Sequence, residues 1–246
     1  MGESDRLIRL VDQVTAVLSD APVSSSTARS LDAVALYRFF RSGEEETLAL
    51  RGVSLHVDAG EIVAVTGPSG SGKSTLLSCL AGLDEPTAGT VRIAGERMSA
   101  RPESERAALR ADRIGVLFQS NNLFAHLTVE ENVQLAQRLS PRSSPSPAPR
   151  EIVARVGLAD RTRSLPSQLS GGEAARAGLA VALANDPVFL LADEPTGELD
   201  GDTEQRLLDL LRAHADRGCA ILLVSHSPHV VAVADRVIEL EDGRIR

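Results

Sequence analysis

The stretch Ile62-Val-Ala-Val-Thr-Gly-Pro-Ser-Gly-Ser-Gly-Lys-Ser-Thr75 decides the fold of this 246-residue chain. It begins with an apolar run of strand length, 62–66, and ends with Gly67–Thr75, which matches the pattern GxxxxGK[ST] of a phosphate-binding loop. The apolar stretch Leu76–Leu80 follows at once and predicts a helix. Strand, loop and helix in this order are the context that the motif requires. A glycine-rich turn with a chance lysine is therefore the weaker interpretation.

The residues of this loop are suited to holding phosphate groups. Glycines let backbone N–H groups converge on phosphate oxygens, and the N-terminus of the next helix adds about half a positive charge. We expect Lys73 to reach the β- and γ-phosphates of a nucleotide and the Ser74 hydroxyl to ligate Mg²⁺. The candidate nucleotide-binding residues of the loop are Gly67, Pro68, Ser69, Gly70, Ser71, Gly72, Lys73, Ser74 and Thr75.

Two further apolar runs, Val188–Ala192 and Ala220–Ser225, predict buried strands. Small or polar residues occupy their carboxyl ends, which is where ligands bind in open α/β sheets. Helical patterns lie between the runs, and this alternation predicts an α/β fold. Aromatic residues are scarce, so Leu, Val, Ile and Ala must fill the core, which suits a mostly parallel sheet covered by helices.

Two acidic residues, Asp193 and Glu194, directly follow the run Val188–Ala192. A carboxylate at the tip of a buried strand can face a Mg²⁺ ion held by the phosphate-binding loop, so Asp193 is a candidate metal ligand. Glu194 is well placed to polarise an attacking water molecule. Two solvated acids at a strand end would mean little alone, and the loop upstream makes the catalytic interpretation the stronger one.

With these motifs the chain resembles the nucleotide-binding domains of ABC transporters, from about residue 31 to residue 246. Leu169-Ser-Gly-Gly-Glu173 matches the signature motif of that family, and the other family motifs follow in the expected order. The matching positions are Gln119 for the Q-loop glutamine, Gly197-Glu-Leu-Asp200 for the D-loop, His226 for the switch histidine and Phe40 for the aromatic that stacks on adenine. Tyr37 is close to Phe40 in sequence, and either ring could be ordinary packing.

The resemblance implies a P-loop NTPase fold with an antiparallel β subdomain and an inserted α-helical subdomain. It also implies ATP hydrolysis coupled to transport or mechanotransmission, with ATP and Mg²⁺ as cofactors. The catalytic residues that it implies are Glu194, His226 and Gln119, and the Mg²⁺ ligands are Ser74, Gln119 and Asp193.

The signature and D-loop residues imply a dimer. In the family the signature binds the γ-phosphate of the ATP that the opposite subunit holds, and the residues assigned in this way are Ser170, Gly171, Gly172 and Asp200. The chain carries one copy of each motif. The resemblance therefore implies a second copy of this chain or a paralogous ATPase subunit as the partner.

The resemblance further implies a separate integral membrane permease, which ATP-driven closure of the dimer would power. We expect its contact surface at residues 121–128, where exposed Leu123 and Phe124 would receive a coupling helix. The stretches 78–84 and 193–200 are similar to the branch of lipoprotein-release, macrolide-export and cell-division ATPases. One departure follows the signature, where Val181 stands in place of the usual arginine while Arg176 is kept. This departure puts the coupling and the turnover rate in question.

Beyond the main domain, residues 3–19 have apolar side chains at helical spacing and predict an amphipathic helix. A polar linker follows at 21–30. We therefore expect residues 1–30 to precede an ABC ATPase domain at 31–246, with its helical subdomain at about 100–185. The stretch 141–149 contains four prolines and predicts an exposed loop between two helical stretches.

The composition argues against several kinds of protein. A net charge of −8 and a 2% share of aromatic residues weigh against a nucleic-acid partner. No apolar run approaches the ~18 residues of a membrane span, and the N-terminus lacks the apolar core of a signal peptide. We expect a cytoplasmic protein, held on the inner face of the plasma membrane by the permease. Cys79 and Cys219 lie in apolar stretches and predict buried free thiols.

Two alternatives belong to other classes. A soluble ABC ATPase of chromosomes or DNA repair would carry a long coiled coil between Thr75 and Leu169, and this interval has no sustained heptads. The translation factors of the family carry two such domains in one chain. A binding module without hydrolysis is the other alternative, and the intact catalytic positions argue against it.

Overall fold

The computed structural model of the chain describes residues 30–42, 45–120, 122–141, 147–197 and 199–246. The predicted helix at 3–19 and the predicted linker before Ser30 lie outside the described residues. The same is true of Asn121, in the predicted permease contact, and of Glu198, in the predicted D-loop.

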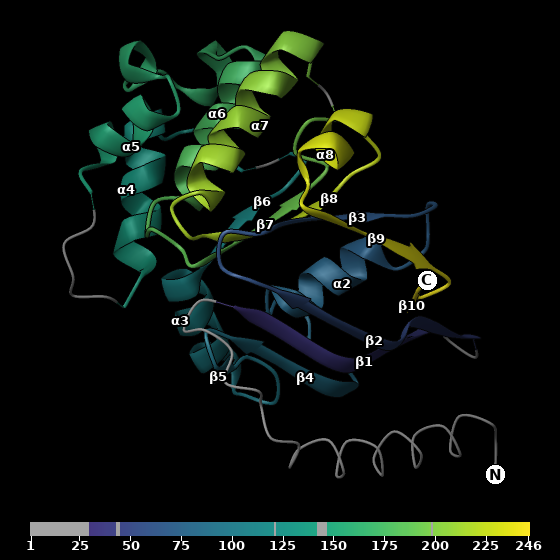
Figure 1. The fold of residues 1–246 in the computed structure, drawn as a ribbon. Helices are drawn as coiled ribbons and strands as arrows, with labels where there is room; N and C mark the ends of the chain where they lie inside the picture. The colour runs from purple at the N-terminus through teal and green to yellow at the C-terminus, as the bar shows by residue number, and fades with distance from the viewer. Residues whose placement is uncertain (1–29, 43–44, 121, 142–146, 198) are drawn as a thin grey trace, which may run out of the picture.

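An antiparallel sheet forms the lower part of the molecule in Figure 1. Its strands, in the spatial order β2-β1-β4-β5, are β1 (Leu31–Ser42), β2 (Glu45–Val57), β4 (Ala88–Ile93) and β5 (Glu96–Arg97). The main domain thus begins in regular structure at Leu31, and the expectation of an antiparallel β subdomain is confirmed.

A six-stranded sheet forms the second layer, in the order β10-β9-β3-β8-β7-β6. Its strands are β3 (Ile62–Thr66), β6 (Ile114–Leu117), β7 (Phe189–Asp193), β8 (Ala220–Val224), β9 (Arg236–Glu241) and β10 (Arg244–Ile245). All pairings are parallel except β9 with β10. The α/β fold is confirmed, with small shifts at strand ends: Asp193 closes β7 and Ser225 lies just beyond β8.

Alternate residues of the central strands pack on two different cores. In β3, Val63 and Val65 face the core shared with the antiparallel sheet, whereas Ile62 and Ala64 face the core under the outer helices. Strands buried on both faces read as continuous apolar runs, which is why these strands were visible in the sequence.

The helices divide between these two cores (Figure 1). They are α2 (Lys73–Leu80), α3 (Glu103–Arg113), α4 (Val129–Leu139), α5 (Pro149–Arg155), α6 (Gly171–Ala182), α7 (Gly201–Ala215) and α8 (Pro228–Val233), with short 3-10 turns η1 (Ala159–Arg161) and η2 (Pro166–Gln168). Helix α2 lies between the two sheets, whereas α4 to α8 cover the opposite face of the six-stranded sheet. The predicted helical stretch at 100–185 is interrupted by β6, which belongs to that sheet.

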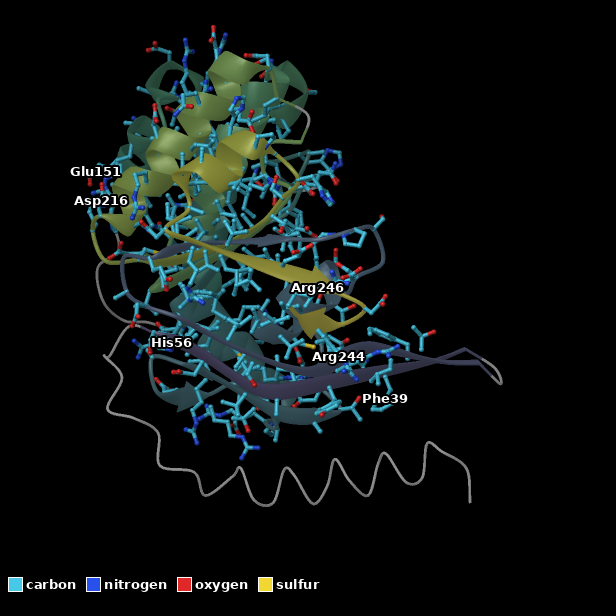
Figure 2. All side chains as sticks on the ribbon, turned by 45° about the vertical axis from the view of Figure 1, so that its right-hand side comes forward. Phe39, His56, Glu151, Asp216, Arg244 and Arg246 are labelled. Atoms are coloured by element: carbon cyan, nitrogen blue, oxygen red, sulfur yellow. The ribbon has the colours of Figure 1, made fainter. Side chains whose placement is uncertain are left out.

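Side chains fill the space between the layers, and charged groups such as Asp216 and Arg246 lie on the outside (Figure 2). Cys79 and Cys219 are both buried free thiols, as predicted. The proline-rich stretch separates α4 from α5, although its last residue, Pro149, is already the first residue of α5. Within the described part of the chain, no helix combines the length and the apolar character that a membrane span requires.

Candidate functional site

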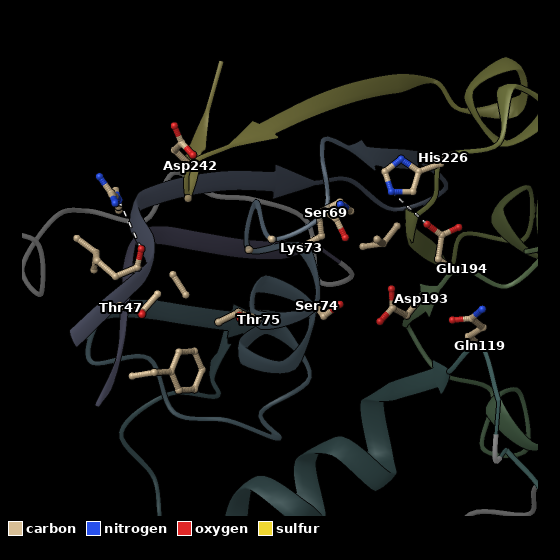
Figure 3. Close-up of a pocket in the computed structure, with 18 residues that line it drawn as sticks. Thr47, Ser69, Lys73, Ser74, Thr75, Gln119, Asp193, Glu194, His226 and Asp242 are labelled. Atoms are coloured by element: carbon tan, nitrogen blue, oxygen red, sulfur yellow. Dashed lines mark hydrogen bonds and ion pairs between the residues drawn. The ribbon is translucent and has the colours of Figure 1, made fainter. Parts of the chain in front are cut away.

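A cavity of about 590 Å³ opens at the carboxyl ends of β3, β7 and β8 (Figure 3). Its volume lies in the range of small-molecule sites. The predicted site residues that line it are Phe40, Ser69, Gly70, Gly72, Lys73, Ser74, Thr75, Gln119, Asp193, Glu194 and His226. The phosphate-binding loop and the acidic end of β7 thus face the same space.

Two glycines of the loop are required by close backbone packing. A Cβ atom at Gly67 would lie 2.0 Å from the carbonyl oxygen of Leu240, and one at Gly72 would lie 2.5 Å from that of Ala49. Gly72 also has φ +103° and serves as the N-cap of α2. The loop is therefore fixed by backbone atoms of β2 and β9, and the N-terminus of α2 is directed toward the cavity.

Lys73, the only lysine of the chain, is buried beneath the loop. Its Nζ donates hydrogen bonds to the carbonyl oxygens of Gly67, at 2.7 Å, and Pro68, at 2.8 Å. The buried hydroxyl of Ser71 has no hydrogen-bond partner among the described residues. The loop thus offers a cation and a spare hydroxyl where an anion would be bound.

Asp193, the last residue of β7, is half-buried next to Ser74 of the loop. Burial raises the pKa of the Asp193 carboxyl above its usual value, and a hydrogen bond from Ser74 partly opposes that rise. The negative charge of Glu194 raises the pKa further, whereas Lys73 lowers it. A carboxylate in this setting would be stabilised by a cation beside it.

Glu194 is held in an uncommon backbone conformation, with φ +45°. Its N–H donates to the carbonyl of Val224 at 2.8 Å, which ties it to the end of β8. The Ser225 hydroxyl donates to Oε2 at 3.0 Å, and His226 Nε2 lies 3.7 Å from Oε1. Figure 3 shows His226 and Glu194 facing each other across the end of the sheet, with Gln119 on the side of β6.

Phe40, rather than Tyr37, lines the cavity. The guanidinium carbon of Arg38 lies 4.5 Å from the centre of the Phe40 ring, and the Arg38 side chain also makes a two-bond ion pair with Asp84 at 2.7 and 2.8 Å. The Tyr37 hydroxyl lies against Gly52, where an added Cβ would be 2.9 Å from it.

The signature residues lie outside this cavity. Ser170 is the N-cap of α6, and its hydroxyl accepts from the Glu173 N–H at 3.2 Å while the Glu173 carboxylate accepts from the Ser170 N–H at 2.9 Å. Gly171 lines a separate hollow of about 330 Å³ together with Gln119 and Glu194. The first turn of α6 is thus exposed beside Glu194 and Gln119, and it does not line the cavity that the phosphate-binding loop faces.

Two further predicted residues also have local partners. A Cβ at Gly172 would lie 2.3 Å from Thr203 Cγ2, so this glycine allows α6 to approach α7. Asp200 is the N-cap of α7 and accepts hydrogen bonds from the Thr203 N–H, at 3.0 Å, and hydroxyl, at 2.9 Å. Within the chain, Asp200 therefore acts as a helix cap.

Several cavity residues belong to no recognisable sequence motif. They are Thr47, Leu48, Ala49, Arg51, Val224, Asp242 and Gly243. Four of them belong to β2, Val224 ends β8, and the last two form the turn after β9; no motif marks any of them. Ser225 was also missed, although a hydroxyl at a strand end, just before the predicted switch histidine, was a usable signal.

In the predicted permease contact, Phe124 is exposed, at 65%, and so are Ala125 and His126. The expectation that Leu123 is exposed is wrong. Leu123 is half-buried and packs against the core under the outer helices.

Comparison with known proteins finds a match to the family model described as ABC transporter over residues 50–197. The macrolide export ATP-binding/permease protein MacB of Salmonella typhimurium is 43% identical over 210 residues, which are 85% of this chain and 32% of MacB. The chain thus spans about a third of the length of the MacB relatives. ABC transporter ATP-binding protein Rv0986 of Mycobacterium tuberculosis is 43% identical over 84% of both chains.

Among solved structures, the ATP-binding cassette MJ0796 matches in two forms. Its dimeric structure has a TM-score of 0.80 and 35% identity, over 88% of this chain and 96% of that chain. A dimeric post-hydrolysis state bound to ADP and Pi has a TM-score of 0.81 at the same identity and coverage.

Proposed function

Because the chain belongs to the ABC transporter family, as an ATP-binding and ATP-hydrolysing domain, we propose that its cavity holds one ATP and its Mg²⁺ for hydrolysis at the interface of a dimer. One observation carries the residue assignments: the phosphate-binding loop, Gln119, Asp193, Glu194 and His226 line a single cavity.

The loop would bind the phosphates through its backbone N–H groups and the N-terminus of α2. Lys73 would exchange its bonds with Gly67 and Pro68 for bonds to the β- and γ-phosphates. Phe40 would stack on the adenine, with Arg38 behind its ring. Thr75 and Ser69, which also line the cavity, would donate from the two ends of the loop.

Mg²⁺ fits the oxygen donors at this site. Ser74, Asp193 and Gln119 all face the cavity. Burial raises the pKa of the Asp193 carboxyl, so a cation bound beside it would favour its ionised form. In the part of the chain that the structure describes, no three His, Cys, Asp or Glu side chains form a group that could hold a metal ion. Phosphate oxygens would complete the coordination, as is usual for Mg²⁺, and the ion would neutralise charge on the phosphates.

Glu194 would act as the general base. A water oxygen attacks the γ-phosphorus, the bond to the β–γ bridging oxygen breaks, and ADP leaves, while the proton of the water passes to the Glu194 carboxylate. His226, beside Oε1 of Glu194, would contact the γ-phosphate, and Gln119 would orient the water from the opposite side.

The position of the signature favours a dimer. Ser170, Gly171 and Gly172 begin α6 outside the cavity of their own chain, so their exposed helix N-terminus would serve the γ-phosphate of a partner's ATP. Asp200, at the start of α7, would lie at the same interface. The partner would be a second copy of the chain or a paralogous subunit.

A permease would receive the work of dimer closure. The MacB relatives are named as ATP-binding/permease proteins, and this chain spans about a third of their length. The exposed Phe124 ring would enter such a contact, and the protein would then lie at the inner face of the plasma membrane.

The test of this function is Glu194→Gln in the full chain. The variant should bind ATP with unchanged affinity and lose on the order of 10²-fold or more in turnover, because Gln keeps the shape and cannot accept the proton. Steady-state release of inorganic phosphate and equilibrium binding of ATP give the two readings. Unchanged turnover would remove Glu194 from the role of general base.

A further inference from the structure

Glu204 is a buried carboxylate that no motif in the chain explains. It lies in the first turn of α7, and only 7% of the residue is exposed. The Ser227 hydroxyl donates to its Oε1 at 2.6 Å, and His229 Nδ1 lies 2.7 Å from its Oε2. Because a carboxylate only accepts hydrogen bonds, the proton of the second bond must be on His229 Nδ1.

The Glu204 carboxyl is ionised in this setting. Burial alone would raise the pKa of Glu204, but hydrogen bonds from Ser227 and His229 outweigh it and lower that pKa. An ionised group that is buried and fully engaged fixes its partners in place, because releasing them would leave a charge without solvation. Both partners belong to the segment that begins α8, directly after His226.

From Ser227 the hydrogen bonds continue to Glu194. The Ser227 N–H donates to the Ser225 hydroxyl at 3.1 Å, and that hydroxyl donates to Glu194 Oε2 at 3.0 Å. Ser225 is 1% exposed, so water does not compete for these bonds. A continuous path therefore runs from Glu204 in α7, through the two serines, to Glu194.

His226 lies between the two serines of this path. Its own side chain is 58% exposed and its Nε2 is 3.7 Å from Glu194, which is too far for a hydrogen bond. The backbone on either side of His226 is thus fixed by Ser225 and Ser227, while its exposed imidazole makes no hydrogen bond to Glu194. Glu204 holds Ser227 in place through the hydrogen bond that it accepts from the Ser227 hydroxyl.

We propose that Glu204 is a positioning residue for ATP hydrolysis: through Ser227 and Ser225 it orients the Glu194 carboxylate and holds the backbone of His226. This inference rests on the proposed function, since it takes Glu194 as the general base. Glu204 itself does not line the nucleotide cavity. It therefore acts on the rate of hydrolysis and leaves ATP binding unchanged.

The test compares Glu204→Ala, Ser227→Ala and the double variant in the full chain. Each single substitution should lower kcat about 10-fold with KM for ATP changed by less than about 2-fold, because orientation of the base affects only the chemical step. The double variant should be no slower than either single one, since both break the same path. Glu204→Gln should retain most of kcat, because its carbonyl oxygen can still accept from Ser227.

Asp209→Ala is the matched control, since Asp209 is an exposed acid of the same helix whose carboxylate accepts a hydrogen bond from Gln205. It should leave kcat unchanged. Wild-type kcat in Glu204→Ala, beside an inactive Glu194→Gln, would overturn the positioning role alone. Losses that multiply in the double variant would also overturn it, because Glu204 would then act by a route other than Ser227. A wild-type chain that does not hydrolyse ATP, or an active Glu194→Gln variant, would instead overturn the proposed function.

Discussion

The two halves of the site are built in different ways. The phosphate-binding loop is held by backbone atoms, since Gly67 and Gly72 pack against carbonyl groups of neighbouring strands and Lys73 bonds the loop's own carbonyls. The opposite half, around Glu194 and His226, is held by side-chain hydrogen bonds and contains a residue with positive φ. The first half is a preformed cradle, whereas the second can be rearranged by exchanging single hydrogen bonds.

This difference follows from the tasks that the two halves would have. Anion binding benefits from backbone donors that are already in place, because only the Lys73 side chain then has to exchange hydrogen bonds when phosphate arrives. Hydrolysis would instead depend on the orientation of the base, which a few side-chain hydrogen bonds set. Substitutions in the cradle should therefore alter binding and stability, and substitutions around Glu194 should alter turnover.

The largest effect is expected from Lys73→Ala. Removing the only lysine eliminates two charge-assisted hydrogen bonds to phosphate, each worth about 1.5–3 kcal/mol, so the Kd for ATP should rise on the order of 10²-fold or more. Isothermal titration calorimetry measures the change directly. As an independent reading, an amine-reactive ATP analogue should label wild type at Lys73 in competition with ATP. Normal affinity in the variant would show that the cradle does not depend on its cation.

A comparison of Gly72→Ala with Gly70→Ala tests whether backbone contacts hold the phosphate-binding loop in place. Both glycines have positive φ, but a Cβ at Gly72 would lie 2.5 Å from the Ala49 carbonyl oxygen, whereas one at Gly70 would meet no atom within 4 Å. Gly72→Ala should lower the free energy of unfolding by about 3 kcal/mol, and Gly70→Ala by about 1 kcal/mol. Thermal unfolding without nucleotide separates them, since 1 kcal/mol is about 2–4 °C at this size. Equal losses would mean that φ alone, and not packing, matters.

The same contrast explains how much the sequence could predict. The cradle residues are consecutive, so the motif at 67–75 and the strand before it could be recognised locally, as could Asp193 at the end of a buried run. The half of the site around Glu194 and His226 depends instead on hydrogen bonds between residues that are distant in sequence. Glu204 and Ser227, for example, are 23 positions apart. Side-chain pairing at that distance leaves no pattern in a single sequence, and neither does the sheet register that brings Arg51 and Asp242 to the cavity.

Acidification should destabilise α7, which carries Glu204 in its first turn, because His214 lies in the last turn of the same helix. Burial, together with the charge of Arg217, which donates to His214 Nδ1 at 2.7 Å, lowers the pKa of His214 to about 4. The unfolded state, with a pKa near 6.5, takes up the proton first as pH falls. Stability is therefore complete above pH 6.5 and is lost between pH 6.5 and 4, by about 2 kcal/mol from pH 7 to pH 5.

His214→Asn should remove this part of the pH dependence, because the amide oxygen can accept from Arg217 and does not titrate. Urea unfolding at pH 7 and pH 5 gives the stability difference for both proteins. At pH 5, the backbone amides of α7 should exchange faster than those of α2 in the wild type. The difference between the two exchange rates should be smaller in the variant. An unchanged pH slope in the variant would assign the acid sensitivity to other groups.

The smallest effect is expected at Phe40, which shares features of both halves. Its strand is part of the rigid antiparallel sheet, yet its ring is placed by a side-chain contact with Arg38, which Asp84 fixes in turn. Stacking of one base on an aromatic ring contributes about 1–3 kcal/mol, and the low end applies here because the ring is 42% exposed. Phe40→Ala should therefore raise the Kd for ATP about 5- to 10-fold and leave the Kd for tripolyphosphate unchanged.

Tyr37→Phe is the control, since that side chain points toward Gly52 and away from the cavity, and ATP affinity should not change. An equal loss of ATP and tripolyphosphate affinity in Phe40→Ala would contradict stacking, and would mean that the ring supports the phosphate-binding loop instead. Weaker binding of ATP with unchanged binding of tripolyphosphate would confirm stacking. Phe40 would then belong to the preformed half of the site, because the ion pair between Arg38 and Asp84 joins β1 to the segment following α2 before ATP binds.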